Sequence, residues 1–457
     1  MIKERIPIEK NSQYEVEIDG WSSDGNGVAH IDGYAVFIPF TIVGERWIIK
    51  IVKVSSSAIY GKALQLLLSS EHRVSPICEN FGKCGGCHTL HMTYSKELEY
   101  KLNVVNNTLR HVGGLNFQID QIYPSDLEFR YRNKSICAVG EDANQVKCGF
   151  YKKRTHEIIP IKQCFLQSER ADRVNNVITT WLNNNKFKAY NEENGKGTVR
   201  HIFTRSARYT EDFVVCIISA RGFGNKTHDL IDFVVKECPF VTGIVLNINK
   251  SRGNTILSGD FHTLWGDPYI HDSLNGIQFQ IAPQAFYQVN PLQAEKMYNK
   301  ISEFAHLSGN ETVIDLYCGT GTIGLTLAGK AKKVFGIEIV PEAIENAIEN
   351  ANYNGISNIS FVCSDASESI LLELGNSSSP DVVVVDPPRK GLSSKVIKMI
   401  FEINPSKIIY VSCNPSTLAR DLALMQEHYD ITQGCSFDMF PRTNHVETVV
   451  LMSRVKD

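Results

Sequence analysis

Two segments of the sequence place chemically useful side chains directly after a predicted strand. Cys413 follows the apolar run Ile408–Val411 and precedes a helical pattern that opens at Pro415. Asp386 follows four consecutive valines and begins the rigid, polar segment Asp386–Leu392. In an open α/β sheet, ligands bind outside the carboxyl ends of the strands. The two segments therefore predict an active site that holds a thiol nucleophile and a carboxylate.

The predicted position of Cys413 bears on its reactivity. This residue stands where the strand ends and the helix begins, and a helix N-terminus carries a partial positive charge. Such a charge favours the thiolate, which is the nucleophilic form of cysteine, over the thiol. We therefore expect the pKa of Cys413 to be lowered, unlike that of a buried structural cysteine.

A glycine-rich segment predicts a second part of this site. Gly319, Gly321 and Gly324 lie where one strand ends and a helix opens, and glycines there let the backbone turn tightly and approach a ligand. Glu338 ends the next predicted strand, where an acidic residue can accept hydrogen bonds from both ribose hydroxyls of a nucleoside cofactor. The spacing alone fits several such cofactors, nicotinamide dinucleotides among them.

Four cysteines form a separate set. Cys78, Cys84 and Cys87 lie among glycines that allow a loop to wrap a small object, and Cys164 follows much later in the chain. Four thiolates can hold a tetrahedral zinc ion or an iron–sulfur cluster. The spacing of these residues leaves both possibilities open.

The composition is that of an ordinary globular protein. Hydrophobic residues make up 43% and charged residues 21% of the 457 residues. No apolar run approaches the roughly 18 residues of a membrane-spanning helix. Twelve cysteines in a chain of this length do not form a secreted disulfide scaffold. We expect a cytoplasmic protein that does not associate with a membrane.

The net charge of −3 argues against a protein that binds nucleic acid by overall electrostatic attraction. A local basic groove remains compatible with this charge. The candidates for contacts with phosphate groups are Arg130, Arg132, Lys134 and the segment Arg200–Arg205. An ordinary solvated surface explains the same basic residues equally well.

Patterns along the chain predict three structural parts. Residues 14–68 alternate like short strands, with the turn signal Asp32-Gly33 between two of them, and suggest a small OB-like barrel. Residues 73–264 indicate a mixed α/β structure in which Phe213–Ile218 is a strand buried on both faces. Beyond residue 275, strands and helices alternate, which predicts a parallel, doubly wound sheet. Its strands are expected at Thr312–Leu316, Val334–Glu338, Ile359–Cys363, Val382–Asp386 and Lys407–Ser412.

Five motifs together resemble the RNA uracil-C5 methyltransferase family, whose members form 5-methyluridine with S-adenosylmethionine. They are Gln284–Asn290, Asp315–Gly321, Asp386–Leu392, Ser412–Leu422 and His445–Val449. The amino-terminal segment resembles the TRAM domain, an RNA-binding module of this family. The resemblance implies an α/β fold with a Rossmann-like class I methyltransferase domain, a mixed α/β central domain and an N-terminal OB-like β-barrel.

The resemblance also implies how the chain is divided into domains. Residues 1–68 would form the TRAM barrel. Residues 69–94 and 127–274 would form a central iron–sulfur and RNA-binding domain, and residues 95–126 and 275–457 the methyltransferase domain. The excursion of residues 95–126 into the last domain follows from the resemblance alone.

Roles for individual residues follow from the same resemblance. The catalytic residues would be Cys413, as the nucleophile, and Glu447, as the general base. The contacts with S-adenosyl-L-methionine would come from Gln288, Tyr317, Glu338 and Asp386. A match to cluster-bearing members favours a [4Fe-4S] cluster on Cys78, Cys84, Cys87 and Cys164. The expected substrate is RNA, with 23S rRNA favoured and tRNA as the alternative, and we expect a monomer.

Two other functions remain open at this point. An amino-methyltransferase also uses an Asp-Pro-Pro loop but needs no nucleophilic thiol. A non-catalytic iron–sulfur protein that binds RNA would need none of Asp386, Cys413 and Glu447, so the presence of these residues argues against it.

Overall fold

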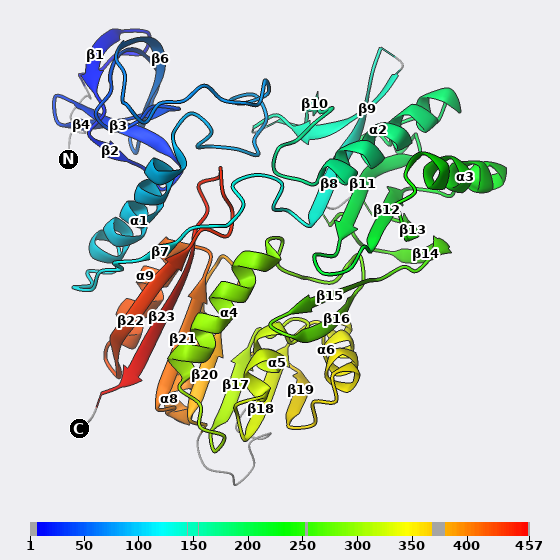
Figure 1. Ribbon diagram of the computed structural model, residues 1–457. Helices are drawn as coiled ribbons and strands as arrows, with labels where there is room; N and C mark the ends of the chain where they lie inside the picture. The colour runs from blue at the N-terminus through cyan, green and yellow to red at the C-terminus, as the bar shows by residue number, and fades with distance from the viewer. Residues whose placement is uncertain (1–6, 144, 154, 252–254, 368–379, 456–457) are drawn as a thin grey trace.

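The computed structural model describes residues 7–143, 145–153, 155–251, 255–367 and 380–455. Figure 1 shows three lobes, each built around one sheet: the amino-terminal sheet in blue, the central domain in green, and the carboxyl-terminal domain in yellow to red. No helix in the described part of the chain is both long enough and apolar enough to cross a bilayer.

The amino-terminal lobe is a curled six-stranded sheet with the order β1-β5-β6-β4-β3-β2. Isoleucines and valines on one face of these strands form its core. The predicted turn at Asp32-Gly33 is confirmed, because both residues have the positive φ, 49° and 81°, that a two-residue hairpin turn requires. The strands are β1 (Gln13–Glu17), β2 (Gly20–Trp21), β3 (Asn26–Ile31), β4 (Tyr34–Pro39), β5 (Arg46–Val54) and β6 (Ile59–Leu68).

The central lobe is a seven-stranded sheet with the order β10-β9-β8-β11-β12-β13-β14. All residues of β12 are buried, which confirms the predicted strand with two covered faces. Its strands are β8 (Lys134–Asp142), β9 (Gln145–Tyr151), β10 (Ile158–Pro160), β11 (Val199–Ser206), β12 (Phe213–Ser219), β13 (Gly243–Ile248) and β14 (Asp260–Gly266). The helices are α2 (Glu169–Asn184), η1 (Gly224–Lys226) and α3 (Thr227–Glu237).

The carboxyl-terminal lobe contains the predicted doubly wound sheet. The strand order is β19-β18-β17-β20-β21-β23-β22-β7, and the first five strands are parallel. These strands are β17 (Thr312–Leu316), β18 (Lys333–Glu338), β19 (Ile359–Cys363), β20 (Val382–Val385) and β21 (Lys407–Ser412), within one residue of the predicted bounds. The two long strands β22 (Tyr429–Phe437) and β23 (Glu447–Arg454) complete it, with β23 antiparallel to both neighbours.

Helices cover both faces of this sheet (Figure 1). They are α4 (Pro291–Ala305), α5 (Thr322–Ala328), α6 (Pro341–Tyr353), α8 (Ser394–Ile403) and α9 (Pro415–Met425). A short hairpin of β15 (Ile270–Leu274) and β16 (Ile277–Ile281) precedes α4.

The segment after the amino-terminal sheet reaches the carboxyl-terminal lobe. Helix α1 (Tyr94–His111) shares a hydrophobic core with α9, in which Val105 and Leu109 belong to the same cluster as Leu418 and Leu422. The following strand β7 (Ile122–Tyr123) adds to the sheet beside β22. The exact division of the chain into three domains stays a prediction.

Candidate active site

Four neighbouring strands of the carboxyl-terminal sheet end at one edge. Across this edge the predicted site residues stand in the order Glu338 (β18), Tyr317 (β17), Asp386 (β20) and Cys413 (β21). Strand β17 lies in the middle of the five parallel strands. The chain continues from β17 to β18 on one side and later reaches β20 on the other side. Doubly wound sheets bind ligands at such a switch point.

The antiparallel pairing of β21 and β23 brings Glu447 to Cys413. Ser412, the last residue of β21, pairs with Thr448, so Cys413 directly after this pair and Glu447 directly before it lie close to each other. Glu447 is only 5% exposed. Burial and the neighbouring Asp386 raise the pKa of Glu447 well above its ordinary value, whereas Arg389 acts in the opposite direction.

The prediction of a lowered pKa for Cys413 is wrong for the free protein. Burial, together with the carboxyl groups of Glu447 and Asp386, raises the pKa of this thiol to about 11. Helix α9 does begin two residues later, at Pro415, but burial and the two carboxyl groups outweigh the partial charge of its terminus. The Cys413 side chain is therefore a thiol at neutral pH in the free protein.

Arg389 is a residue of this site that the sequence interpretation missed. Its guanidinium lowers the pKa of both Cys413 and Glu447, and its Nη2 lies 3.3 Å from His445 Nε2. The sequence feature that could have identified Arg389 is its position three residues after Asp386, in the same polar segment. Arg389 is the group that opposes the upward shift of the Cys413 pKa.

Replacing Arg389 with glutamine should make Cys413 a less reactive thiol. The loss of the cation raises the pKa of Cys413 further, so less thiolate is present at any pH between about 7 and 10. Alkylation by iodoacetamide, followed by mass spectrometry of the Cys413 peptide, should be slower in the variant. The exposed Cys363 is the internal reference. Unchanged alkylation of Cys413, or equal slowing at Cys363, would contradict this role of Arg389.

Hydrogen bonds hold the Asp-Pro-Pro loop against α9. The carbonyl oxygen of Arg389 accepts from Asn414 Nδ2 at 2.9 Å, and Asp421 accepts from the N–H of Leu392 at 2.8 Å. Gly391 has a φ of 74°, and a Cβ atom there would approach Asp421 Oδ2 to 2.5 Å. Glycine is thus required at this position both by its backbone conformation and by the close approach. The two loops that carry the predicted site residues are therefore fixed relative to each other.

The loop between β22 and β23 is held by buried charges. Lys101 of α1 is fully buried and donates to Glu97 at 2.7 Å and to Asp438 at 2.6 Å. Glu97 also accepts from the backbone N–H of Arg442 at 2.7 Å, and Arg442 has a φ of 68°. Removing one member would leave an uncompensated buried charge. This network, which the sequence did not reveal, positions the segment that leads to the start of β23.

The glycine-rich segment and Glu338 lie together at the ends of β17 and β18. Glu338 Oε2 accepts from the Gly319 N–H at 3.2 Å, and Oε1 accepts from the Ile339 N–H at 2.9 Å. Tyr317 has a φ of 64°, which is uncommon for a residue with a side chain. Ile339 is 59% exposed beside these groups. The surface therefore offers a carboxylate, close backbone approach and an apolar side chain, which suit a nucleoside.

Three carboxyl groups, those of Asp315, Glu338 and Asp386, lie near one another at this edge. Burial raises the pKa of Asp386 to about 7 and, with the nearby Asp386 and Glu338, that of Asp315 to about 8. Asp315 Oδ2 accepts from the Gly324 N–H at 2.8 Å, while Oδ1 has no partner within the described part of the chain. S-adenosylmethionine is a nucleoside with a sulfonium and an ammonium group, so the residues at this edge fit it better than they fit an anionic dinucleotide.

Gln288 lies near the same edge from the loop before α4. It is 8% exposed, and its side chain lowers the pKa of the Tyr298 hydroxyl group, which Asp386 raises. The backbone of Gln288 is anchored to the central domain, since its carbonyl oxygen accepts from Asn133 Nδ2 at 3.0 Å. Gln288 and Asp386 therefore both approach Tyr298.

The prediction that Arg200 and Arg205 contact phosphate groups is wrong. Arg205 is 1% exposed, and its Nη1 donates to the carbonyl oxygens of Ala282 and Ala285 at 2.8 and 2.9 Å. Arg200 is 5% exposed and donates to the carbonyl oxygen of Ser251 at 2.6 Å. Both side chains hold protein loops in place, and neither is available to RNA. A pattern of basic residues could not reveal this burial.

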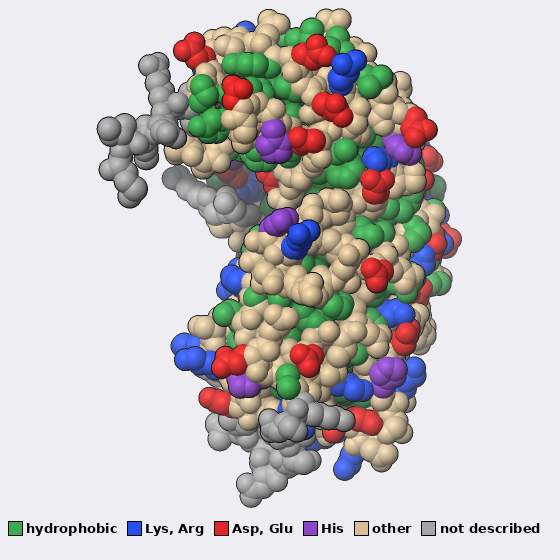
Figure 2. Space-filling model, turned by 90° about the vertical axis from the view of Figure 1, so that its left-hand side faces the viewer, with side chains coloured by type: hydrophobic (Ala, Val, Ile, Leu, Met, Phe, Trp, Pro, Cys, Tyr) green, Lys and Arg blue, Asp and Glu red, His purple; other side chains and the backbone are tan. Residues whose placement is uncertain are grey.

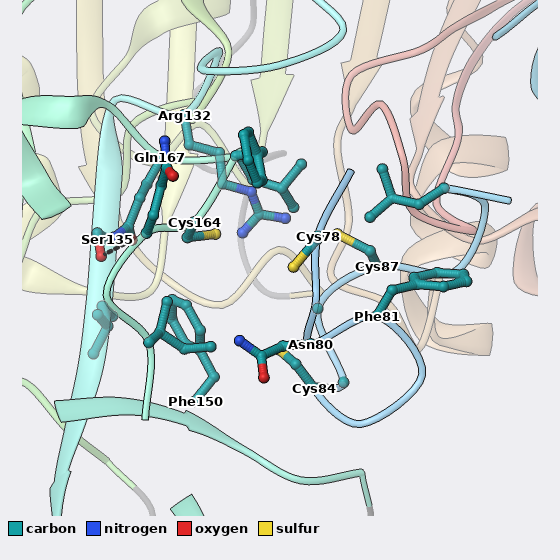
Figure 3. Close-up of a pocket in the computed structure, with 18 of the residues that line it drawn as sticks. Cys78, Asn80, Phe81, Cys84, Cys87, Arg132, Ser135, Phe150, Cys164 and Gln167 are labelled. Atoms are coloured by element: carbon teal, nitrogen blue, oxygen red, sulfur yellow. Dashed lines mark hydrogen bonds between the residues drawn. The ribbon is translucent and has the colours of Figure 1, made fainter. Parts of the chain in front are cut away.

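The four predicted cluster ligands line one pocket of 430 Å³. Figure 3 shows Cys78, Cys84 and Cys87 on one loop and Cys164 on the opposite side, with Arg132 directed toward the space between them. Burial and the neighbouring thiols raise the pKa of Cys87. Within the described residues, no three histidine, cysteine or acidic side chains converge closely enough to hold a single metal ion. The thiols therefore surround the pocket instead of meeting at one point.

The surface carries no large area of one charge on the side that Figure 2 shows. Lysine and arginine side chains are interspersed there with aspartate and glutamate, and the outline is concave on one side. Arg130, a predicted phosphate contact, is instead paired with Asp172 at 2.7 Å. Any recognition of nucleic acid on this face must therefore rest on local contacts.

Two family models match the sequence. The model described as tRNA (Uracil-5-)-methyltransferase matches residues 266–455, and the model of the TRAM domain matches residues 7–64. The first range covers the doubly wound sheet with its strand-end residues, and the second covers most of the amino-terminal sheet.

Proteins of similar length resemble the chain from end to end. It is 41% identical over 454 residues to an uncharacterized RNA methyltransferase of Clostridium acetobutylicum, across 98% of this chain and 99% of that protein. It is 40% identical over 454 residues to another of Halalkalibacterium halodurans, across 99% of both. The crystal structure of the tRNA (uracil-54, C5)-methyltransferase of Pyrococcus abyssi with S-adenosyl-L-homocysteine matches with a TM-score of 0.79 and 28% identity, over 96% of this chain and 99% of that one.

Proposed function

Because the chain belongs to the RNA uracil-C5 methyltransferase family and uses S-adenosylmethionine to methylate uridine in RNA, we propose that Cys413, Glu447 and Asp386 carry out this reaction. The observation that supports the assignment best is the register of β21 and β23. It brings a buried carboxyl close to the thiol, at the sheet edge where Asp386 and the proposed nucleoside-binding residues lie.

The chemistry requires a nucleophile because C5 of uracil is itself a poor one. The Cys413 thiol gives up its proton to water, the thiolate adds to C6, and the electron pair of the C5–C6 double bond moves to C5 and the neighbouring carbonyl. C5 can then attack the methyl group that S-adenosylmethionine supplies when bound, and the bond between that methyl group and the sulfur breaks to leave S-adenosylhomocysteine. A base removes the proton from C5, the C5–C6 double bond forms again, and the C6–S bond breaks to return the Cys413 thiolate.

Glu447 is the base in this scheme. It lies close to Cys413, and its raised pKa makes its carboxylate a stronger base than an exposed glutamate would be. Arg389 favours the ionised form that the step requires. His445 is less suited, because burial and the nearby Arg389 lower its pKa to about 4 and make it a weak base.

The remaining site residues would hold the methyl donor. We assign the ribose hydroxyl groups to Glu338, and contacts with the rest of the cofactor to Tyr317, Gln288 and Asp386. This assignment is supported by the shared strand edge of Glu338, Tyr317 and Asp386 and by the approach of Gln288 through Tyr298. Asp386 acts on the pKa of both Cys413 and Glu447, so it is also close enough to the catalytic pair to contact the uracil, and we propose the same second role for Gln288.

We propose 23S rRNA as the substrate, because the TRAM domain and the cysteine set together resemble the iron–sulfur-containing bacterial members of the family. The Pyrococcus abyssi relative is a tRNA (uracil-54, C5)-methyltransferase, which makes tRNA the second candidate. Mass mapping of 5-methyluridine in both RNAs, from cells with and without the gene, separates them. Loss of one or more sites from 23S rRNA is the expected result, and loss from tRNA alone would overturn the assignment.

We further propose that Cys78, Cys84, Cys87 and Cys164 hold a [4Fe-4S] cluster. The pocket of 430 Å³ that they surround is supporting evidence, since it offers room for a group larger than a single metal ion. A cluster of four irons and four sulfides is wider and keeps its thiolates farther apart. The cluster lies in the central domain, apart from the thiol of Cys413.

Protein purified without oxygen should be brown and contain roughly four irons per chain. Replacing Cys164 with serine should lower the iron content and weaken the visible absorbance, because one thiolate ligand is lost. Replacing Cys363, an exposed cysteine outside the pocket, with serine is the matched control and should leave both unchanged. Stoichiometric zinc without visible absorbance would contradict the proposal.

A further inference from the structure

The amino-terminal domain forms part of the wall of the cavity beside Cys413. This cavity has a volume of 310 Å³. One side is formed by Cys413, Arg389 and His445, and another by Ser23 and Asp24, which lie in the loop between β2 and β3. The cavity next to the proposed nucleophile is thus shared between residues more than 350 positions apart in the chain.

The loop between β2 and β3 is held in this position by contacts with α1 and with the loop before β23. The carbonyl oxygen of Ser23 accepts from Tyr100 Oη at 3.3 Å and from Asn444 Nδ2 at 3.4 Å. Gly25 has a φ of 79°, and a Cβ atom there would lie 3.5 Å from both the Tyr100 hydroxyl and the Asn444 side chain. The ring of Trp21 meets that of Tyr100 edge-on, with centroids 5.7 Å apart. The loop is therefore held as a wall of the cavity.

The position of the cavity indicates which part of the substrate it would take. Its lining includes Cys413 but not Asp386, Glu447 or Gln288, the groups proposed to surround the uracil and the methyl donor. A base that has left its stack to reach Cys413 brings its own sugar behind it. The cavity adjoins the thiol without including these groups, so it is suited to the ribose of the target nucleotide.

Asp24 has the chemistry to recognise that ribose. It is the only carboxylate in the cavity lining, its side chain is exposed, and it makes no hydrogen bond or ion pair with the residues that the structure describes. A carboxylate only accepts hydrogen bonds. The ribose 2′-hydroxyl is a donor, and it is the group by which proteins distinguish RNA from DNA.

We propose that Asp24 accepts a hydrogen bond from the 2′-hydroxyl of the target uridine, so that the TRAM domain selects ribose at the active site. The proposal rests on the proposed function, and specifically on Cys413 as the nucleophile. A hydrogen bond to a charged group corresponds to roughly a 10- to 100-fold effect on kcat/KM.

The test combines a protein variant with a substrate variant. One RNA carries uridine at the target position, and a second carries 2′-deoxyuridine at that position alone. The wild-type enzyme should prefer the first RNA roughly 10- to 100-fold in kcat/KM. Asp24→Ala should lower kcat/KM for the uridine RNA by about the same factor and leave that for the deoxyuridine RNA nearly unchanged. Glu17→Gln removes a carboxylate from another strand of the same sheet and should behave as the wild type.

Three results would overturn the proposal: no preference of the wild type for ribose, an equal loss on both RNAs in Asp24→Ala, or no loss on either. Thermal unfolding of Asp24→Ala shows whether the loop change has damaged the fold, and Asp24→Asn, which keeps an acceptor oxygen, should retain part of the preference. Failure of the proposed function gives a different result, since the wild type would then methylate neither RNA.

Discussion

Replacing Cys413 with alanine should abolish methylation while leaving the binding of RNA and S-adenosylmethionine intact. The thiolate is needed to make C5 of uracil nucleophilic, and no other cysteine lines the cavity. The expected loss is on the order of 10⁴-fold or more, comparable to the loss of a covalent nucleophile in other enzymes. Transfer of a radiolabelled methyl group to RNA measures the loss, and filter binding measures RNA affinity.

The control for this variant is Cys238→Ala, which removes a thiol from the central domain and should keep its activity. Substantial turnover by Cys413→Ala would show that the reaction needs no thiol. The mechanism would then be that of an amino-methyltransferase, which uses the Asp-Pro-Pro loop alone.

Replacing Glu447 with glutamine should stop the reaction after methyl transfer, because the amide cannot accept the C5 proton. The variant is nearly isosteric and still forms the Cys413 adduct, so a covalent complex of protein and methylated RNA should accumulate with ordinary RNA. Gel electrophoresis under denaturing conditions would reveal it as a retarded band. The expected loss in turnover is roughly 10²–10⁴-fold, the usual contribution of a positioned acid or base.

Glu427→Gln provides a matched comparison, since it makes the same change at an exposed position outside the site. It should release methylated RNA at the wild-type rate. Release at that rate by Glu447→Gln would instead assign the proton to His445 or to a bound water molecule.

The five parallel strands of the carboxyl-terminal sheet were predictable because they are largely apolar and several end in distinctive polar motifs, whereas β22, β23 and β7 were not among the predicted strands. Thr312–Leu316 and Lys407–Ser412 appear with the predicted bounds, and Asp386 and Cys413 follow their strands as expected. In the amino-terminal sheet, the short strand β2 was not predicted, since two residues are too few to show a periodic pattern. Local patterns thus located the residues at the sheet edge.

Properties that depend on packing between distant segments were not predictable. The pKa of Cys413 is set largely by burial and by Glu447, which reaches it only through the pairing of β21 with β23. The burial of Arg205 depends on a loop about 80 residues further along the chain. The place of Asp24 beside the catalytic cavity depends on how the amino-terminal sheet docks onto α1 and the loop before β23.

The attack of Cys413 on C6 of a uridine in RNA can be tested with 5-fluorouridine. A base cannot remove fluorine from C5 as it removes a proton, so the adduct persists after methyl transfer. We expect a stable complex of the wild-type enzyme with RNA that carries 5-fluorouridine at the target position. Its formation should require S-adenosylmethionine, and mass spectrometry should locate the nucleotide on the peptide that contains Cys413. Methylation of ordinary RNA without any such complex, or a complex attached to a different residue, would show that Cys413 is not the nucleophile.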